Sequence, residues 1–187
     1  MIVSDDFAGG SLNSAWQIAG APGISVGVAT NSTDAYLQLV TPDGNYDAWG
    51  TITGANAMQA APNTDFQLKT RFLTVPTQQY QMQGFLVEQD AQNWLRFDTY
   101  FDGSVLRAFA AVTLGGSSSW QISVAVPGNT APYLRLTRTG NLWTFEYSQN
   151  GTTWTTAGSF TQALTVTAVG LFSGNTGPAA GYTARVD

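Results

Sequence analysis

The stretch that decides the fold is NWLRFDTYFDGSVLRAFAAVT, residues 93–113. In its first half, apolar side chains such as Leu95 and Phe97 alternate with a second set of side chains. A period of two residues is typical of a β-strand with one face on a core. Asp102-Gly103 interrupts the alternation, and this dipeptide between two strands is the signal of a two-residue type I′ hairpin turn. The stretch therefore predicts two antiparallel strands whose Leu95 and Phe97 side faces a core.

Similar short runs recur along the whole chain, separated by Gly, Asn, Asp and Pro residues. No segment keeps a helical period with sensible caps. About fourteen strands in a chain of 187 residues is the density of two stacked antiparallel sheets. We therefore expect a single all-β domain over residues 1–187, a two-sheet antiparallel jelly-roll sandwich. Its strands are predicted near Ile2–Phe7, Ile24–Ala29, Tyr36–Val40, Ala48–Thr51, Phe66–Val75, Gln81–Glu88, Asn93–Tyr100, Ser104–Thr113, Gln121–Val126, Tyr133–Thr139, Leu142–Ser148, Trp154–Phe160, Val166–Ser173 and Tyr182–Val186.

The composition narrows the class of partner. Charged residues make up only 10% of the chain, against roughly 25% in an average globular domain. The formal net charge is −5, and Lys69 is the only lysine. Because phosphate recognition needs clustered Lys and Arg, nucleic acid and anionic membrane are poor candidates. No apolar run reaches the roughly 18 residues of a membrane span, so we expect no membrane insertion.

Several segments together resemble a known family. They are YDAWG (46–50), NTDFQLKTRF (63–72), QMQGFLVEQDAQNWLRFDTYFDG (81–103), PYLRLTRTGNLWTFEYSQNGTTW (132–154) and VGLFSGN (169–175). In this order they resemble a bacterial family of concanavalin A-like domains, of the kind found at the C-terminus of β-xylosidases and appended to secreted glycan-active enzymes and adhesins. The resemblance implies a jelly roll with a concave face suited to glycans, usually without catalytic activity.

The aromatic residues give the strongest functional signal. A protein binds a sugar by stacking a ring on its apolar C–H face and by aiming polar groups at its hydroxyls. Trp94, Arg96, Asp98 and Tyr100 share one side of a strand, because they alternate with the predicted core set. The sequence therefore predicts a carbohydrate-binding face. Its remaining candidate residues are Tyr46, Asp47 and Trp49 in a second aromatic and acidic cluster, Gln83 as a hydrogen-bonding group, and Trp120 beside a glycine- and serine-rich loop.

Two other interpretations stay open. These aromatic residues can belong to the core, with Arg96 and Asp98 as a structural ion pair. The domain can also be an adhesin or spacer whose ligand is not a sugar.

The chain lacks several of the residue types that enzymes commonly use for catalysis. The chain has no histidine and no cysteine, which removes the Ser-His-Asp triad, thiol chemistry and most zinc sites. Hydrolases of the laminarinase type carry Glu-x-Asp-x-x-Glu on a strand of this fold. Here Glu88-Gln89-Asp90 is followed by Asn93, so the third carboxylate is missing. Tyr100 with Arg96 is the alternative, as the base and acid of a polysaccharide lyase. We expect a protein that is not an enzyme, with no catalytic residue.

Acidic residues near the two ends of the chain are candidate metal ligands. Jelly-roll domains often hold a structural Ca²⁺ where the termini meet, and Asp5, Asp6 and Asp187 are the candidate ligands, since Ca²⁺ prefers carboxylate oxygens. No other cofactor is expected.

An acidic, lysine-poor chain without cysteine is typical of a bacterial secreted or cell-surface protein. We expect the domain to be part of a longer secreted protein and to have a polysaccharide or glycoconjugate as its partner.

Overall fold

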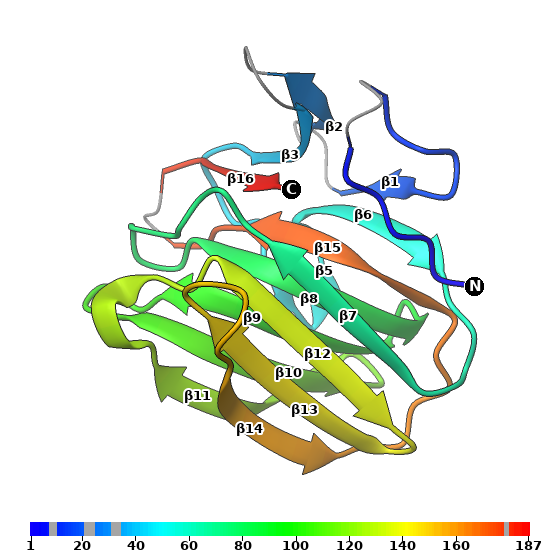
Figure 1. Ribbon diagram of the computed structural model, residues 1–187. Helices are drawn as coiled ribbons and strands as arrows, with labels where there is room; N and C mark the ends of the chain where they lie inside the picture. The colour runs from blue at the N-terminus through cyan, green and yellow to red at the C-terminus, as the bar shows by residue number, and fades with distance from the viewer. Residues whose placement is uncertain (8–10, 21–24, 31–34, 178–179) are drawn as a thin grey trace.

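The computed structural model describes residues 1–7, 11–20, 25–30, 35–177 and 180–187, with the backbone alone for 25–30. Two layers of antiparallel strands lie on one another (Figure 1). The predicted all-β jelly-roll sandwich is confirmed. The first layer is a seven-stranded sheet with the order β1 (Gln17–Ala19), β6 (Ala55–Ala60), β15 (Ala168–Gly174), β8 (Met82–Asp90), β9 (Asn93–Phe101), β10 (Leu106–Leu114) and β11 (Ser117–Ala125).

The second layer consists of two smaller sheets. One has the order β14 (Thr155–Thr161), β13 (Leu142–Ser148), β12 (Tyr133–Thr139) and β7 (Phe66–Arg71), and the other has the order β16 (Tyr182–Val186), β3 (Ala35–Thr41) and β2 (Ser25–Thr30). A bridge between Phe72 and Val186 connects them. A short hairpin, β4 (Ala48–Trp49) and β5 (Thr51–Ile52), and one turn of 3₁₀ helix at Pro127–Asn129 complete the elements. No helix in the described ranges has the length and apolar character to span a bilayer.

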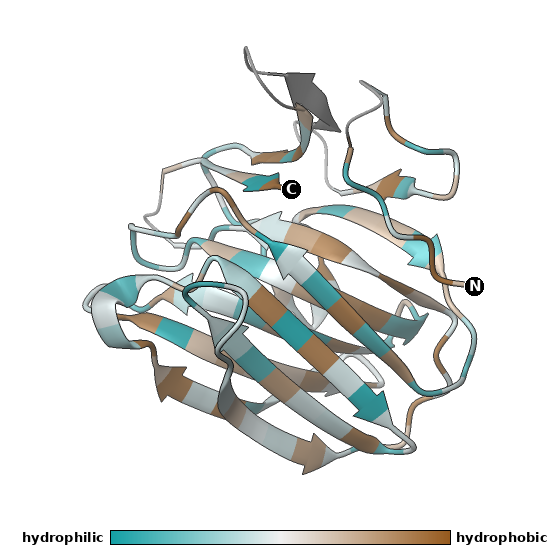
Figure 2. Cartoon of the chain, viewed as in Figure 1, coloured by the Kyte–Doolittle hydropathy of each residue, from teal (hydrophilic) through white to brown (hydrophobic). Residues whose placement is uncertain are grey.

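The main core fills the space between the layers. Leu95 and Phe97 of β9 are fully buried there, as their alternation predicts. The ring of Phe97 lies 5.7 Å from that of Phe145 and 6.0 Å from that of Trp143, both from β13 of the facing sheet. Figure 2 shows the matching pattern on β12, where apolar and polar residues alternate in bands. The period-two pattern therefore decides which side of each strand carries the core.

The turn at Asp102 differs from its prediction. Leu106 pairs with Phe101, so four residues connect β9 and β10 instead of two. Of these four, only Gly103 has a positive φ, at 100°, whereas a type I′ turn needs two such residues. The Asp102 carboxylate stabilises the longer loop by accepting hydrogen bonds from the backbone N–H groups of Ser104 and Val105, each at 2.8 Å. The hairpin was predicted correctly and its turn type was not.

Asp102 gives a pH-dependent prediction. The backbone N–H of Val105, with further hydrogen bonds from Ser104 and Arg107, lowers the pKa of this carboxyl. A carboxyl with a lowered folded-state pKa adds stability above its unfolded pKa of about 3.9, and this contribution is lost as the pH falls through the folded-state value. We therefore expect Asp102→Asn to lower the urea midpoint at pH 7, by an amount that shrinks as the pH falls below about 3.9. A change of equal size at every pH value would contradict the ionic role.

Several regions of the fold were predicted wrongly. The segment expected as one strand at Ala48–Thr51 forms the two short antiparallel strands β4 and β5. No strand forms over Ile2–Phe7. There the side chain of Gln59, and not a neighbouring strand, forms hydrogen bonds with the backbone N–H and oxygen of Val3, at 2.7 and 3.0 Å. β1 and β6 were missed. The β6 sequence, ANAMQA, has few good strand formers, but its position between β1 and β15 makes it a buried strand. Of the strand predicted at Ile24–Ala29, Ile24 lies outside the described residues.

Candidate ligand-binding site

The outer face of the seven-stranded sheet, which points away from the main core, carries the candidate site. Trp94, Arg96, Asp98 and Tyr100 of β9 lie on this face, opposite to Leu95 and Phe97. The neighbouring strand β10 adds Phe109, whose ring is 5.3 Å from that of Tyr100 and meets it edge-on. The predicted sharing of one face by the four β9 residues is therefore correct.

A hairpin from a distant part of the sequence lies across this face. Residues 46–53, which include β4 and β5, form this covering hairpin. Arg96 holds it through Nη1, which donates to Asp47 Oδ1 and to the backbone oxygen of Ala48, both at 2.9 Å. At the tip, the backbone N–H of Gly50 donates to Ser118 Oγ at 2.8 Å. The hairpin is thus attached to the sheet at its middle and at its tip.

Arg96 and Asp98 form a buried ion pair beneath the hairpin. Arg96 Nε and Nη2 donate to the two carboxylate oxygens of Asp98, each at 2.9 Å, which is the bidentate geometry of a strong pair. Burial raises the pKa of Asp98, and the Arg96 guanidinium offsets part of this effect. Burial acts to lower the pKa of Arg96, but the charges of Asp98 and Asp47 outweigh it, so that this pKa is raised and the guanidinium stays charged. The pair can orient the hairpin but cannot clamp a ligand itself, because Asp98 is 0% exposed.

Trp94 does not present its ring to solvent. Its side chain is 0% exposed and belongs to a second apolar cluster on the outer face, with Ala48 of the hairpin, Leu86 and Phe172 among its members. The expectation that Trp94 stacks on a sugar is therefore wrong, since the covering hairpin occupies that position. Within the described residues, its indole Nε1 has no hydrogen-bond partner.

An open hollow remains between the covering hairpin and the sheet. It has a volume of about 200 Å³, and we call it the Trp49 hollow; its lining residues are Asp47, Trp49, Tyr80, Met82, Arg96, Tyr100, Phe109 and Thr176. Trp49 is 46% exposed, and its ring lies 6.5 Å from that of Phe109. Both hydrogen bonds of the Asp47 carboxylate use Oδ1, so Oδ2 has no partner among the described residues. The hollow therefore combines an accessible ring with a fixed carboxylate.

Most of the chain matches the sequence pattern of one protein family. Residues 25–179 match the family described as "Protein of unknown function (DUF1349)". The chain belongs to the DUF1349 family. No curated protein matches this DUF1349 chain in sequence.

Solved structures show what the DUF1349 fold is similar to. The GH43 protein BlXynB of Bacillus licheniformis matches with a TM-score of 0.77 and 17% identity, over 97% of this chain and 37% of BlXynB. A functionally unknown protein of Saccharomyces cerevisiae matches with a TM-score of 0.69 and 17% identity, over 92% of each chain. The CBM2 module of an evolved Dit protein of Lactobacillus casei BL23 phage J-1 matches with a TM-score of 0.63 and 12% identity, over 97% and 92%.

These similarities are similarities of fold, since every identity is below 25%. The chain spans only about a third of the length of BlXynB, at 37%. The family shown is DUF1349, and membership in the expected family of β-xylosidase C-terminal domains stays a prediction.

Some of the residues predicted for the site of this DUF1349 domain lie together in the structure, and others do not. The Trp49 hollow brings together Asp47, Trp49, Arg96 and Tyr100, as predicted. Gln83 was assigned wrongly: it points to the other side of β8, where it donates to the backbone oxygen of Thr74 at 2.7 Å and accepts from the Tyr182 hydroxyl.

Two predicted aromatic residues lie outside the lining of the Trp49 hollow. Tyr46 is half-buried and pairs through its backbone with Asn175. Trp120 is 65% exposed on β11, where it pairs with Ala111.

Four residues that line the Trp49 hollow were not predicted from the sequence: Tyr80, Met82, Phe109 and Thr176. Phe109 could have been predicted, because it follows the Asp102-Gly103 hairpin. Once the register of the hairpin is known, Phe109 lies on the same face as Arg96 and Tyr100. Tyr80 and Thr176 lie in loops, and no signal in the sequence connects them to β9.

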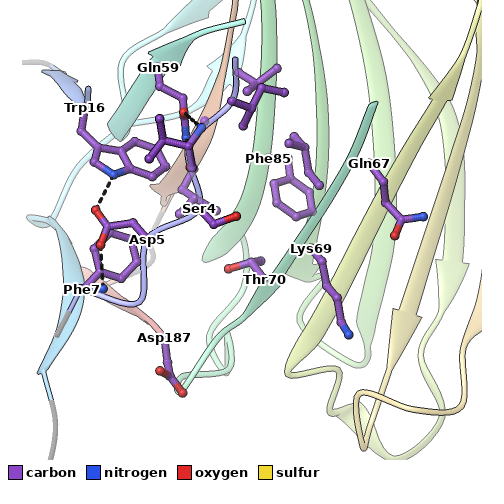
Figure 3. Close-up of a pocket in the computed structure, with 16 residues that line it drawn as sticks. Ser4, Asp5, Phe7, Trp16, Gln59, Gln67, Lys69, Thr70, Phe85 and Asp187 are labelled. Carbon is purple, nitrogen blue, oxygen red and sulfur yellow. Dashed lines mark hydrogen bonds between the residues drawn. The ribbon is translucent and has the colours of Figure 1, made fainter. Parts of the chain in front are cut away.

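The predicted calcium site at Asp5, Asp6 and Asp187 is not assembled. Asp5 accepts hydrogen bonds from the backbone N–H of Phe7 and from Trp16 Nε1, both at 2.9 Å (Figure 3). Asp187 pairs with Arg71 at 2.9 Å. Asp5 and Asp187 line a cavity of about 160 Å³, which Asp6 does not line. Across the described ranges, no group of three or more acidic or histidine side chains is placed to hold a metal ion.

Proposed function

We propose that this domain binds carbohydrate in the Trp49 hollow and does not catalyse a reaction there. The observation that carries the proposal is the exposed Trp49 ring beside the carboxylate of Asp47, which Arg96 fixes in place. An exposed ring offers a flat apolar surface to the C–H face of a sugar. A carboxylate accepts hydrogen bonds only, so its free oxygen is suited to the hydroxyl groups around that face.

The relatives support a ligand of this class. The names of several chains with this fold contain GH43. Another such chain is named as a xylan β-1,4-xylosidase of Bacillus halodurans, with a TM-score of 0.71 and 13% identity. The phage J-1 relative is named as a CBM2 module. Because the matching fold fills 37% of the xylosidase chain, we propose that this domain works as an appended module of a secreted bacterial protein that acts on glycans.

The lining of the Trp49 hollow supports a role without catalysis. A glycosidase of the common type needs two carboxyl groups that flank the scissile bond. Of the residues that line the hollow, Asp47 is the only carboxylic acid. Burial raises the pKa of Tyr100, although its hydrogen bond with Ser123 works against this effect. A phenol with a raised pKa is a poor general base at neutral pH.

Removal of Trp49 tests the proposal. We expect Trp49→Ala to weaken binding by about tenfold or more, or ~1.4 kcal/mol, because the stacking surface is lost. Asp47→Asn keeps the shape of the side chain and removes the charge, and we expect a smaller loss. Binding is measured as retention on insoluble xylan, cellulose and mannan and as retardation in gels that contain xyloglucan.

The matched control for Trp49→Ala is Trp154→Ala. Trp154 is half-buried beside Arg135, whose guanidinium lies 4.2 Å from its ring centre, and Arg135 belongs to the other layer. We expect this variant to bind like the wild type. Binding that survives in the double variant Trp49→Ala/Asp47→Asn would show that the Trp49 hollow is not the carbohydrate-binding site.

A further inference from the structure

The Trp49 hollow is bounded by other segments of the chain at both ends of the strands that form its floor. At the end where β9 begins, the tip of the covering hairpin is attached to Ser118. Ser118 pairs with Thr113, and Thr113 pairs with Trp94, the second residue of β9. At the end where β9 stops, the backbone N–H of Tyr80 donates to the oxygen of Phe101 at 2.7 Å. The hairpin therefore forms one wall and Tyr80 forms the opposite wall.

A third wall stands on the side of β15. Thr176, two residues beyond the end of β15, lines the hollow there. Its hydroxyl is 3.0 Å from Asn45 Oδ1, the same oxygen that accepts from the backbone N–H of Gly177 at 2.8 Å. The pairing of Tyr46 with Asn175 joins this segment to the base of the covering hairpin. The wall is thus continuous with the hairpin.

The open side faces β10 and β11. Trp120 pairs with Ala111, which lies on β10 two residues from Phe109. Residues two apart on a strand share a face, so the Trp120 ring belongs to the same face as the floor of the hollow. At 65% exposed, Trp120 is the most exposed aromatic residue of the described chain. A ligand that enters from this side passes Trp120 first.

The far side of the covering hairpin does not continue the site. A second hollow of about 480 Å³ lies there, lined by residues that include Ile18, Met58 and Glu88. The two hollows have no lining residue in common. A chain that ran through both would have to lift the hairpin from Trp94 and break its bonds to Arg96.

We propose that the Trp49 hollow recognises the end of a glycan chain, and that the rest of the chain leaves across β10 and β11 over Trp120. This inference rests on the proposed function and names its ligand as a terminal sugar residue. A hollow with three walls admits one end of a chain, whereas an open trough admits its interior. The ring of Trp120 provides a stacking surface for a residue further along the chain.

The number of chain ends is the variable that tests the inference. Xylan, xyloglucan, cellulose and mannan are each prepared intact and after partial cleavage by an endo-acting hydrolase, and the bound protein at saturation is measured per unit mass. For the polysaccharide that is bound, we expect the capacity to rise in proportion to the ends, about tenfold for tenfold more ends. Borohydride reduction of the cut sample then distinguishes the two ends: a lost capacity assigns the reducing end, and an unchanged capacity assigns the other end.

Trp120→Ala tests the exit path. We expect it to weaken the binding of oligosaccharides by about threefold to tenfold and to leave the binding of the corresponding monosaccharide unchanged, with Trp154→Ala as the control. A capacity that follows mass instead of ends, with binding that still depends on Trp49, would overturn this inference and leave the proposed function standing. Binding that does not depend on Trp49, or no binding to any of the four polysaccharides, would overturn both.

Discussion

Replacing Arg96 by methionine is expected to lower the free energy of unfolding by about 3–5 kcal/mol, the cost of leaving one member of a buried ion pair uncompensated. Asp98 is 0% exposed, and its carboxylate accepts two hydrogen bonds from Arg96. The same substitution removes the two bonds that attach the middle of the covering hairpin to the sheet. Urea denaturation at pH 7 measures the loss, and we expect carbohydrate binding to be lost as well.

A double variant separates the two effects of Arg96. In Arg96→Met/Asp98→Leu the buried charge is removed along with its partner, and such replacements are often neutral or stabilising. We expect the double variant to recover most of the stability and to remain deficient in binding, because Asp47 no longer has its anchor. A double variant that is no more stable than the single variant would contradict the account of the pair.

The second large effect is expected at Trp94. Trp94→Ala removes a fully buried ring from beneath the covering hairpin, and substitutions of this kind cost about 3–5 kcal/mol. Trp94→Phe is expected to cost less, since it keeps a ring and eliminates an indole N–H that has no partner among the described residues. Thermal and urea unfolding of both variants measure these losses.

The binding of the Trp94 variants distinguishes a structural ring from a ligand-binding one. Because Trp94 does not line the Trp49 hollow, we expect Trp94→Phe to bind carbohydrate like the wild type. A Trp94→Phe variant that folds normally and fails to bind would place this ring in contact with the ligand.

Much of the fold could be predicted because strand alternation is a local property. The alternation of Leu95 and Phe97 with Trp94 and Arg96 determined the core side of β9, and the structure confirms it. β6 could not be found in this way. Its Ala, Asn, Met and Gln side chains are buried because of their neighbours in the sheet, and this information is not local.

The site was predictable only in part, for a related reason. Periodicity shows which residues share a face and does not show what covers that face. Trp94 and Trp49 both read as exposed aromatic residues, yet the hairpin that carries Trp49 buries Trp94. Gln83 was misplaced because both sides of β8 mix polar and apolar residues, so the pattern does not orient the strand.

The most direct test of sugar recognition uses the indole N–H signals of the six tryptophans in a ¹⁵N-labelled sample, during titration with oligosaccharides of the polysaccharide that is bound. We predict that the Trp49 signal moves with the first additions, that the Trp120 signal follows for the longer oligosaccharides, and that the signal of Trp143 in the main core stays in place. A titration in which the Trp49 signal stays fixed while the ligand binds, or in which the Trp154 signal moves in its place, would contradict the account.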